Sequence, residues 1–289
     1  MSSLRYPGGK TRAIPILETY ILNDLKELYS PFFGGGSFEL YIKKKFNIKV
    51  YANDKFEPLY NYWNCIKENK TKLIEEVKKL HPLTKEQFII CKTNLTDITC
   101  DKFTRAACYF AINRSSFSGC TMSGGFSEVA ANQRFTSSSI DRLDKTDLSN
   151  VEFTNQDFAD FIKNIPNNSD KFIFLDPPYY LGKGSKLYGN KGDMHEKFDH
   201  EMLFNNLKNK DNFILCYNDC EYIRNLYKDY IIVSASWAYG MNNSKESSEI
   251  IIMSKKYAEK LKKQKEEIEQ KSVINQTKTK KTVIVKGKK

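Results

Sequence analysis

Short apolar runs alternate with helix-length polar segments along most of the 289-residue chain. Helical periodicity falls between several of these runs, at 56–80, 199–209 and 219–228. The runs themselves predict seven β-strands, at 26–33, 48–54, 151–158, 171–179, 212–219, 230–237 and 248–255. Strands that alternate with helices favour an α/β fold with a mainly parallel sheet that is covered on both faces.

One long section interrupts this alternation. Residues 65–147 contain no convincing buried strand: they are helical at first and then rich in glycine and serine, in NRSSFSGCTMSGGFS. We interpret 65–147 as an insertion, or a small second domain, carried between strands of the sheet. Residues 1–64 and 148–254 then form the main domain, and 255–289 form a charged tail.

The net charge of +11 is unevenly distributed. Thirteen Lys and four Glu give residues 255–289 a charge of +9, which leaves +2 for residues 1–254. The tail is either a solvated helix or an arm that binds phosphates without sequence preference. No apolar run is long enough to span a membrane, and the N-terminus lacks the apolar core of a signal peptide. The seven scattered cysteines suit a reducing cytoplasm or nucleus better than a disulfide framework.

A glycine turn follows the first predicted strand, in SPFFGGGSFEL (30–40). Glycines let the backbone approach a ligand closely, and the helix that follows offers free N–H groups. Asp54, at the end of the next strand, is placed to bind the hydroxyls of a ribose. The F-x-G-x-G spacing differs from the dinucleotide fingerprint. A purely structural turn is the alternative, but the combination favours an adenosine-type ligand.

Two further stretches carry candidate chemistry. In RYPGGKTRAIPIL (5–17), a Gly-Gly turn precedes Lys10, which either begins a helix or reaches a ligand carboxylate or the DNA backbone, with Tyr6 nearby. In FIFLDPPYY (172–180), a strand ends on Asp176 and is followed by two prolines and two tyrosines. A simple strand end is one explanation of this second stretch.

The functional explanation of DPPYY rests on its acceptors. Proline has no N–H and fixes φ, and the residue before it is held extended. The Asp176 carboxylate and the Pro177 carbonyl therefore form a stiff acceptor pair that suits an exocyclic –NH2 group. Holding both hydrogens would free the nitrogen lone pair for attack. Tyr179 offers a ring on which a base can stack, and such a base must leave the duplex.

In this order, YPGGK, FFGGG, YANDKFEP and DPPYY resemble the Dam-type (D12 class) DNA adenine-N6 methyltransferases. NRSSFSG with GGFS, NQDF, FDH and SEIII extend the resemblance over most of residues 4–254. It implies a Rossmann-like S-adenosylmethionine-dependent methyltransferase sheet with a mainly helical target-recognition insertion. The cofactor would be S-adenosyl-L-methionine, and the partner would be double-stranded DNA in the cytoplasm, either in the nucleoid or in a host cell.

The resemblance also implies roles for individual residues. Asp176, Pro177, Pro178 and Tyr179 would hold a flipped adenine. The cofactor would contact Tyr6, Lys10, Phe32, Phe33, Gly34, Gly35, Gly36, Asp54, Asp157, Phe158 and Asp176. Residues 65–147 would recognise DNA, with Arg114, Ser116 and Arg134 as candidate contacts; surface or salt-bridged arginines are the alternative. The N-x-P-F-G signature of GATC-specific members is absent, so we do not infer GATC as the target.

Other activities remain as alternatives. They are methylation of cytosine N4, RNA adenine or a glutamine side chain, or DNA binding without catalysis. Glutamine enzymes typically carry Asn-Pro-Pro-Tyr, so Asp176 counts against them, and the motif order counts against the permuted cytosine-N4 group. We expect no metal: His195 and His200 match no common ligand spacing, and Cys216 and Cys220 lack a second pair. The family is associated with restriction-modification, but the sequence does not tell whether a restriction enzyme accompanies this chain.

Overall fold

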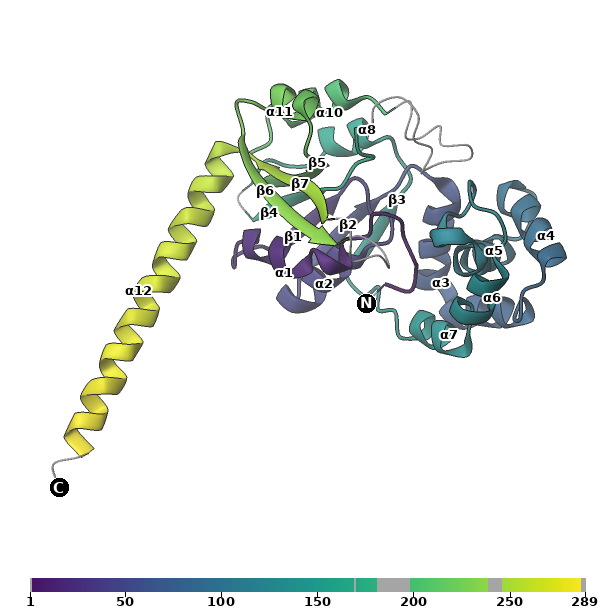
Figure 1. Cartoon of the computed structure of the whole chain (residues 1–289), viewed down its shortest axis with the longest axis horizontal. Coiled ribbons are helices and arrows are strands. Elements are labelled where there is room, and N and C mark those ends of the chain that lie inside the picture. The colour runs from purple at the N-terminus through teal and green to yellow at the C-terminus, as the bar shows by residue number, and fades with distance from the viewer. Residues whose placement is uncertain (1, 169, 181–197, 239–245, 287–289) are drawn as a thin grey trace.

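The computed structural model describes residues 2–168, 170–180, 198–238 and 246–286. Its strands form a seven-stranded sheet in the order β3-β2-β1-β4-β5-β7-β6 (Figure 1). All seven predicted strands are present. They are β1 (Glu27–Ser30), β2 (Lys49–Asn53), β3 (Val151–Thr154), β4 (Lys171–Leu175), β5 (Phe213–Asn218), β6 (Ile231–Ala238) and β7 (Glu246–Met253).

Strands β1 to β5 are parallel, whereas β7 is antiparallel to both of its neighbours, β5 and β6. The predicted α/β fold with a mainly parallel sheet is confirmed, and the antiparallel pair was not predicted. Chain order reverses between β1 and β4, which lie side by side. In sheets of this kind the loops leave such a reversal in opposite directions and open a crevice beyond the carboxyl ends of the strands.

Alternating strand residues supply the two faces of the sheet. Phe172 and Phe174 of β4 belong to a core that includes residues of α1 (Ile14–Leu17), α2 (Ser37–Phe46) and α12 (Lys255–Lys286). Ile173 and Leu175 instead belong to a core that includes α8 (Phe158–Lys163), α10 (His200–Leu207) and α11 (Glu221–Leu226). The result is a sheet between two helical layers.

A helical region extends beyond one side of the sheet (Figure 1). It consists of α3 (Glu57–Lys79), α4 (Lys85–Thr96), α5 (Lys102–Ser115), α6 (Glu128–Arg134) and α7 (Ser137–Asp144). This agrees with the helical character expected for 65–147. Helix α3 crosses the expected boundary at residue 64 and is interrupted only by non-helical torsion angles at Asn69. Three single 3₁₀ turns complete the described elements: η1 (Lys10–Arg12), η2 (Glu18–Tyr20) and η3 (Phe117–Gly119).

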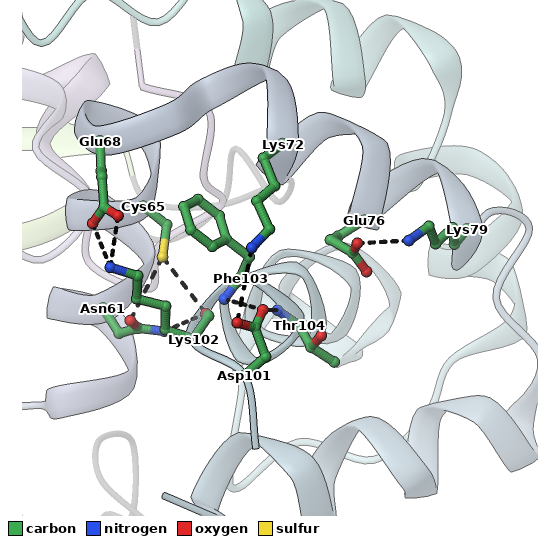
Figure 2. A network of polar contacts seen from close by, with 10 residues as sticks. All are labelled: Asn61, Cys65, Glu68, Lys72, Glu76, Lys79, Asp101, Lys102, Phe103 and Thr104. Carbon is green, nitrogen blue, oxygen red and sulfur yellow. Dashed lines mark hydrogen bonds and ion pairs between the residues drawn. The ribbon is translucent and has the colours of Figure 1, made fainter. Parts of the chain in front are cut away.

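Polar contacts fasten α5 to α3 (Figure 2). Asp101 caps α5 by accepting the N–H groups of Phe103 and Thr104, at 3.0 and 3.2 Å. Next to this cap, Lys102 Nζ lies 2.6 Å from a carboxylate oxygen of Glu68, and the Lys102 carbonyl accepts from Asn61 at 2.9 Å. Helix α5 is thereby held at its amino end, and its carboxyl end leads toward the site described below.

The C-terminal helix α12 begins on the body and then projects away from it (Figure 1). Tyr257 and Leu261 are buried, and the Tyr257 hydroxyl donates to the Tyr20 carbonyl at 2.8 Å. Two turns further on, the Gln264 side chain accepts the Asn23 N–H at 2.7 Å and donates to the Ile21 carbonyl at 3.1 Å. Across the described part of the chain, none of the helices has both the length and the apolar character that crossing a membrane requires.

Candidate active site

A cavity of about 760 Å³ opens at the carboxyl ends of β1 and β4, where the chain order reverses. Stretches far apart in the sequence line it, among them the N-terminal segment, the glycine turn, the DPPY segment and a loop of the helical region. All residues predicted to be catalytic or to bind cofactor lie on its wall, namely Tyr6, Lys10, Phe32, Phe33, Gly34, Gly35, Gly36, Asp54, Asp157, Phe158, Asp176, Pro177, Pro178 and Tyr179. The fold therefore brings these motifs together, although Tyr6 and Tyr179 are 173 positions apart in the sequence.

The glycine turn is shaped by two aromatic rings. Gly34 and Gly36 have positive φ angles of 50° and 61°, which residues with a side chain rarely adopt. A Cβ on Gly34 would lie 2.7 Å from a ring carbon of Tyr6, and one on Gly36 would lie 2.3 Å from a ring carbon of Phe33. Because the two rings fill this space, the turn has no room for side chains. Its main-chain groups therefore border the cavity at the start of α2.

Asp54 holds the glycine turn in place. Its two carboxylate oxygens accept the N–H groups of Gly34 and Phe56, at 2.9 and 3.0 Å. Burial raises the pKa of Asp54 to about 6. Each carboxylate oxygen can accept more than one hydrogen bond, so Asp54 retains capacity for a ligand hydroxyl. The motif predicted a ligand-binding acid, and its structural role in the turn was missed.

Three phenylalanines, Phe32, Phe158 and Phe198, form an aromatic cluster on the cavity wall, with ring centroids 5.2–5.6 Å apart. Phe198 was not among the predicted residues. Asp157, before Phe158, caps α8 and pairs with Lys55 at 2.7 Å. Burial opposes ionisation of Asp157, but the hydrogen bond from Lys55 lowers its pKa overall. This wall combines flat apolar surface with one carboxylate, which suits a heteroaromatic ring with an amino group.

Lys10 pairs with Asp176 across the cavity floor, with 2.6 Å between Lys10 Nζ and Asp176 Oδ1. Lys10 is only 3% exposed and also donates to the Gly8 carbonyl at 3.1 Å. Burial raises the pKa of Asp176, and Lys10 opposes that effect. The sequence predicted that Lys10 reaches a ligand carboxylate or the DNA backbone. In the structure, Lys10 pairs with the carboxylate of the DPPY segment, a contact that the sequence did not predict.

Two buried acids near this pair were not predicted. Glu39 lies in the first turn of α2, lines the cavity and accepts from the Ser30 hydroxyl at 2.7 Å. Burial raises the pKa of Glu39 to about 8. Glu249 of β7 accepts from the Tyr179 hydroxyl. Both acids stand in otherwise apolar stretches, SFEL and SEIII, and that context is the signal that could have identified them.

The loop of the helical region reaches the cavity through Cys120, Thr121 and Met122. Ser116 and Phe126 close its base as an isolated antiparallel bridge. Asn113 joins the loop to the N-terminal segment: its amide donates to the carbonyls of Arg5 and Gly119, at 2.6 and 3.1 Å. A loop of the region expected to recognise DNA therefore borders the same cavity as the DPPY segment.

The placement of two predicted DNA contacts is corrected by the structure. Arg114 is 4% exposed and donates to the Ser3 carbonyl, and Ser116 is fully buried. Burial lowers the pKa of Arg114 to about 10, and Arg142, Arg5 and Arg134 add to this effect. Arg114 therefore supports the N-terminal segment inside the protein, where neither it nor Ser116 is accessible to DNA. Arg134 is half-buried at the edge of this arginine cluster.

The described residues contain no group of three or more His, Cys, Asp or Glu side chains arranged to hold a metal ion. His200 Nδ1 shares a hydrogen bond with the Tyr217 hydroxyl at 2.7 Å, and His195 lies outside the described residues. All seven cysteines, including Cys216 and Cys220, are free thiols.

Comparison with known proteins identifies the family. The model of the D12 class N6 adenine-specific DNA methyltransferases matches residues 6–241, a range that holds every motif lining the cavity. The chain is also 24% identical over 243 residues to the type II methyltransferase M.CviBI of Paramecium bursaria Chlorella virus NC1A. That similarity covers 79% of this chain and 86% of the viral protein. The chain belongs to the D12 class of N6 adenine-specific DNA methyltransferases, enzymes that depend on S-adenosylmethionine and act on DNA.

Proposed function

We propose that this chain methylates the N6 amine of an adenine that has rotated out of duplex DNA into the cavity. The observation that carries this proposal is that the glycine turn and the DPPY segment open into one 760 Å³ space. A methyl donor and a methyl acceptor can therefore meet there. S-adenosylmethionine supplies a methyl group on a positively charged sulfur, which is a leaving group for direct displacement by an amine.

The residues of the glycine-turn side fit such a cofactor. The turn exposes main-chain groups at the start of α2, where anionic groups are favoured. Asp54 is a carboxylate acceptor for ribose hydroxyls, and the aromatic surface of Phe32 and Phe158 beside Asp157 suits an adenine ring. Tyr6 packs against Gly34 and Gly35 of the turn and also lines the cavity.

The DPPY side would hold the target base. The Asp176 carboxylate and the Pro177 carbonyl accept the two N6 hydrogens, so the nitrogen lone pair is directed at the methyl carbon. Lys10 orients the Asp176 carboxylate and favours its charged form. The Tyr179 ring provides the stacking surface. When N6 has gained the methyl group, it loses one proton to Asp176 or to water, and the amine becomes neutral.

We assign target recognition to the helical insertion, residues 65–147, with 1–64 and 148–254 as the catalytic domain. The loop between Ser116 and Phe126 borders the cavity, so it is positioned to contact bases next to the flipped one. Arg134 and the basic tail 255–289 would contact phosphates. Because a viral relative carries the name type II methyltransferase, we infer one short recognition sequence, as in restriction-modification. The enzyme would work in the compartment that holds the DNA, the nucleoid or the host cytoplasm.

Transfer of labelled methyl groups from S-adenosylmethionine to duplex DNA tests the proposal. We expect incorporation at N6 of adenine, and a loss of at least about a thousandfold in Asp176→Ala while cofactor still binds. Asp160→Ala, on the exposed side of α8, is the matched control and should keep full activity. Equal incorporation by wild type and Asp176→Ala would refute the role of Asp176, and incorporation only at cytosine or only into RNA would refute the substrate.

A further inference from the structure

Glu249 is a carboxylate inside the sheet. It is 1% exposed, and Ile250, Ile251 and Ile252 follow it in β7 with no exposure at all. A buried carboxylate is costly unless it accepts hydrogen bonds. Glu249 accepts a hydrogen bond from the hydroxyl of Tyr179, in the DPPY segment 70 residues earlier. The catalytic segment is therefore tied to the strand that stands antiparallel in the sheet.

A second bond joins the same two segments. Asn218 of β5 stands directly opposite Glu249 in the β5–β7 register. Its side-chain amide donates to the main-chain carbonyl of Tyr180 at 2.7 Å. One cross-strand pair thus holds both tyrosines of DPPYY, Tyr179 by its hydroxyl and Tyr180 by its backbone. Glu249 is also paired with Ala235 of β6, so strands on both sides fix its position.

These contacts restrict the Tyr179 ring at both ends. Pro177 and Pro178 limit the backbone that precedes it, and Glu249 holds the phenol oxygen. Lys10 Nζ lies 5.1 Å from the ring centroid, so rotation of the ring would also disturb the Lys10–Asp176 pair. The stacking surface and the acceptor carboxylate are thereby linked to one buried acid.

We propose that Glu249 is a positioning residue for methyl transfer: through the Tyr179 hydroxyl it fixes the ring on which the target base stacks, and Asn218 fixes the adjoining backbone. This inference rests on the proposed function, in which Tyr179 stacks on the flipped adenine. Glu249 touches neither the base nor the reacting atoms. Its effect reaches them through Tyr179.

The test is a double-mutant cycle on single-turnover methyl transfer to plasmid DNA, using Glu249→Ala, Tyr179→Phe and the double variant. We expect Glu249→Ala to slow transfer by about tenfold to a hundredfold, the scale of a misplaced reacting group. In the Tyr179→Phe background, where the hydroxyl is already absent, the same change should cost less than about threefold. Glu249→Gln, which keeps an acceptor oxygen, should restore most of the rate, and the cofactor Kd should not change.

The outcomes separate this inference from the proposed function. If Glu249→Ala slows transfer by the same factor with and without the Tyr179 hydroxyl, Glu249 does not act through Tyr179 and the inference is wrong. If Glu249→Ala does not fold, Glu249→Met, which fills a similar volume without an acceptor oxygen, replaces it in the cycle. Transfer to DNA by the unmodified chain is scored separately. Its absence refutes the proposed function and this inference together, whereas additive losses in an active enzyme refute this inference alone.

Discussion

Individual carboxylates in and around the cavity differ mainly in their partners. Asp54 accepts two main-chain N–H groups, Glu39 accepts a serine hydroxyl, and Asp176 faces the Lys10 ammonium. Of these three, Asp176 is the carboxylate with a direct ion pair. That pairing favours its charged form as an acceptor for an amine, while burial raises the pKa of Glu39 to about 8 and leaves Glu39 largely protonated at neutral pH.

Glu39 is expected to make folding depend on pH. The pKa of Glu39 is near 8 in the folded chain, and the usual value is 4.5. Between these two pH values the folded chain keeps a proton on Glu39 that the unfolded chain has released. Stability should therefore fall as pH rises from about 4.5 to 8. Glu39→Gln should flatten that decline in urea unfolding at pH 5 to 9. An unchanged slope would show that Glu39 is charged in the folded protein.

Sequence patterns predicted single site residues better than pairs. Asp176 and Lys10 were both identified as candidates, but they are 166 residues apart and only the fold shows that they form an ion pair. Arg114 was assigned to DNA because it stands in the segment NRSSFSGCTMSGGFS, which the family resemblance places in the target-recognition region. Helix α5 is buried along nearly its whole length, on all sides, so no amphipathic pattern marked Arg114 as an interior residue.

At the scale of elements, apolar runs located all seven strands. Six of them carry buried residues, and β6 lies at the edge of the sheet, where residues 231–236 are half-buried or exposed. The position and direction of β7 did not follow from its sequence. Ile250, Ile251 and Ile252 are all buried, so the strand has no alternation to show which neighbours it has. The helix predicted at 56–80 is present as α3, and it crosses the expected domain boundary at residue 64 because its apolar face continues through both parts.

Lys43 of α2 fastens the return from the helical region to β3. Its ammonium is 6% exposed and donates to the Asp147 carboxylate at 2.7 Å and to the Ser149 carbonyl at 2.8 Å. The hydrogen bond from Lys43 lowers the pKa of Asp147. Asp147 is 66% exposed, so the ion pair itself contributes little. Loss of Lys43 would also leave the Ser149 carbonyl without its donor, and this would cost more free energy than loss of the ion pair.

We therefore expect Lys43→Ala to lower the free energy of unfolding by about 1–3 kcal/mol. Its neighbour Lys44 is exposed, so Lys44→Ala is the control and should change stability by less than about 0.5 kcal/mol. Urea unfolding of the two variants in parallel measures the difference. Equal stabilities would mean that water replaces Lys43 at little cost.

For the whole molecule, the basic tail divides into an anchored part and a projecting part. Tyr257 is 1% exposed, whereas Ile268, further along α12, is 51% exposed. Tyr257→Ala should lower the free energy of unfolding by about 3–5 kcal/mol, the usual loss for a large buried aromatic side chain. Ile268→Ala should leave it within about 0.5 kcal/mol. Similar losses in both variants would show that the distal helix also packs on the body.

The central claim is that the cavity between the glycine turn and DPPY methylates adenine N6 in DNA. The most direct measurement is sequencing of modified bases in the genome of a host that lacks N6-methyladenine and expresses either the wild-type chain or Asp176→Ala. We expect N6-methyladenine in one short sequence motif with the wild type and none with Asp176→Ala. Unmodified adenine in cells that contain folded wild-type protein, or methylation of another base, would contradict the claim.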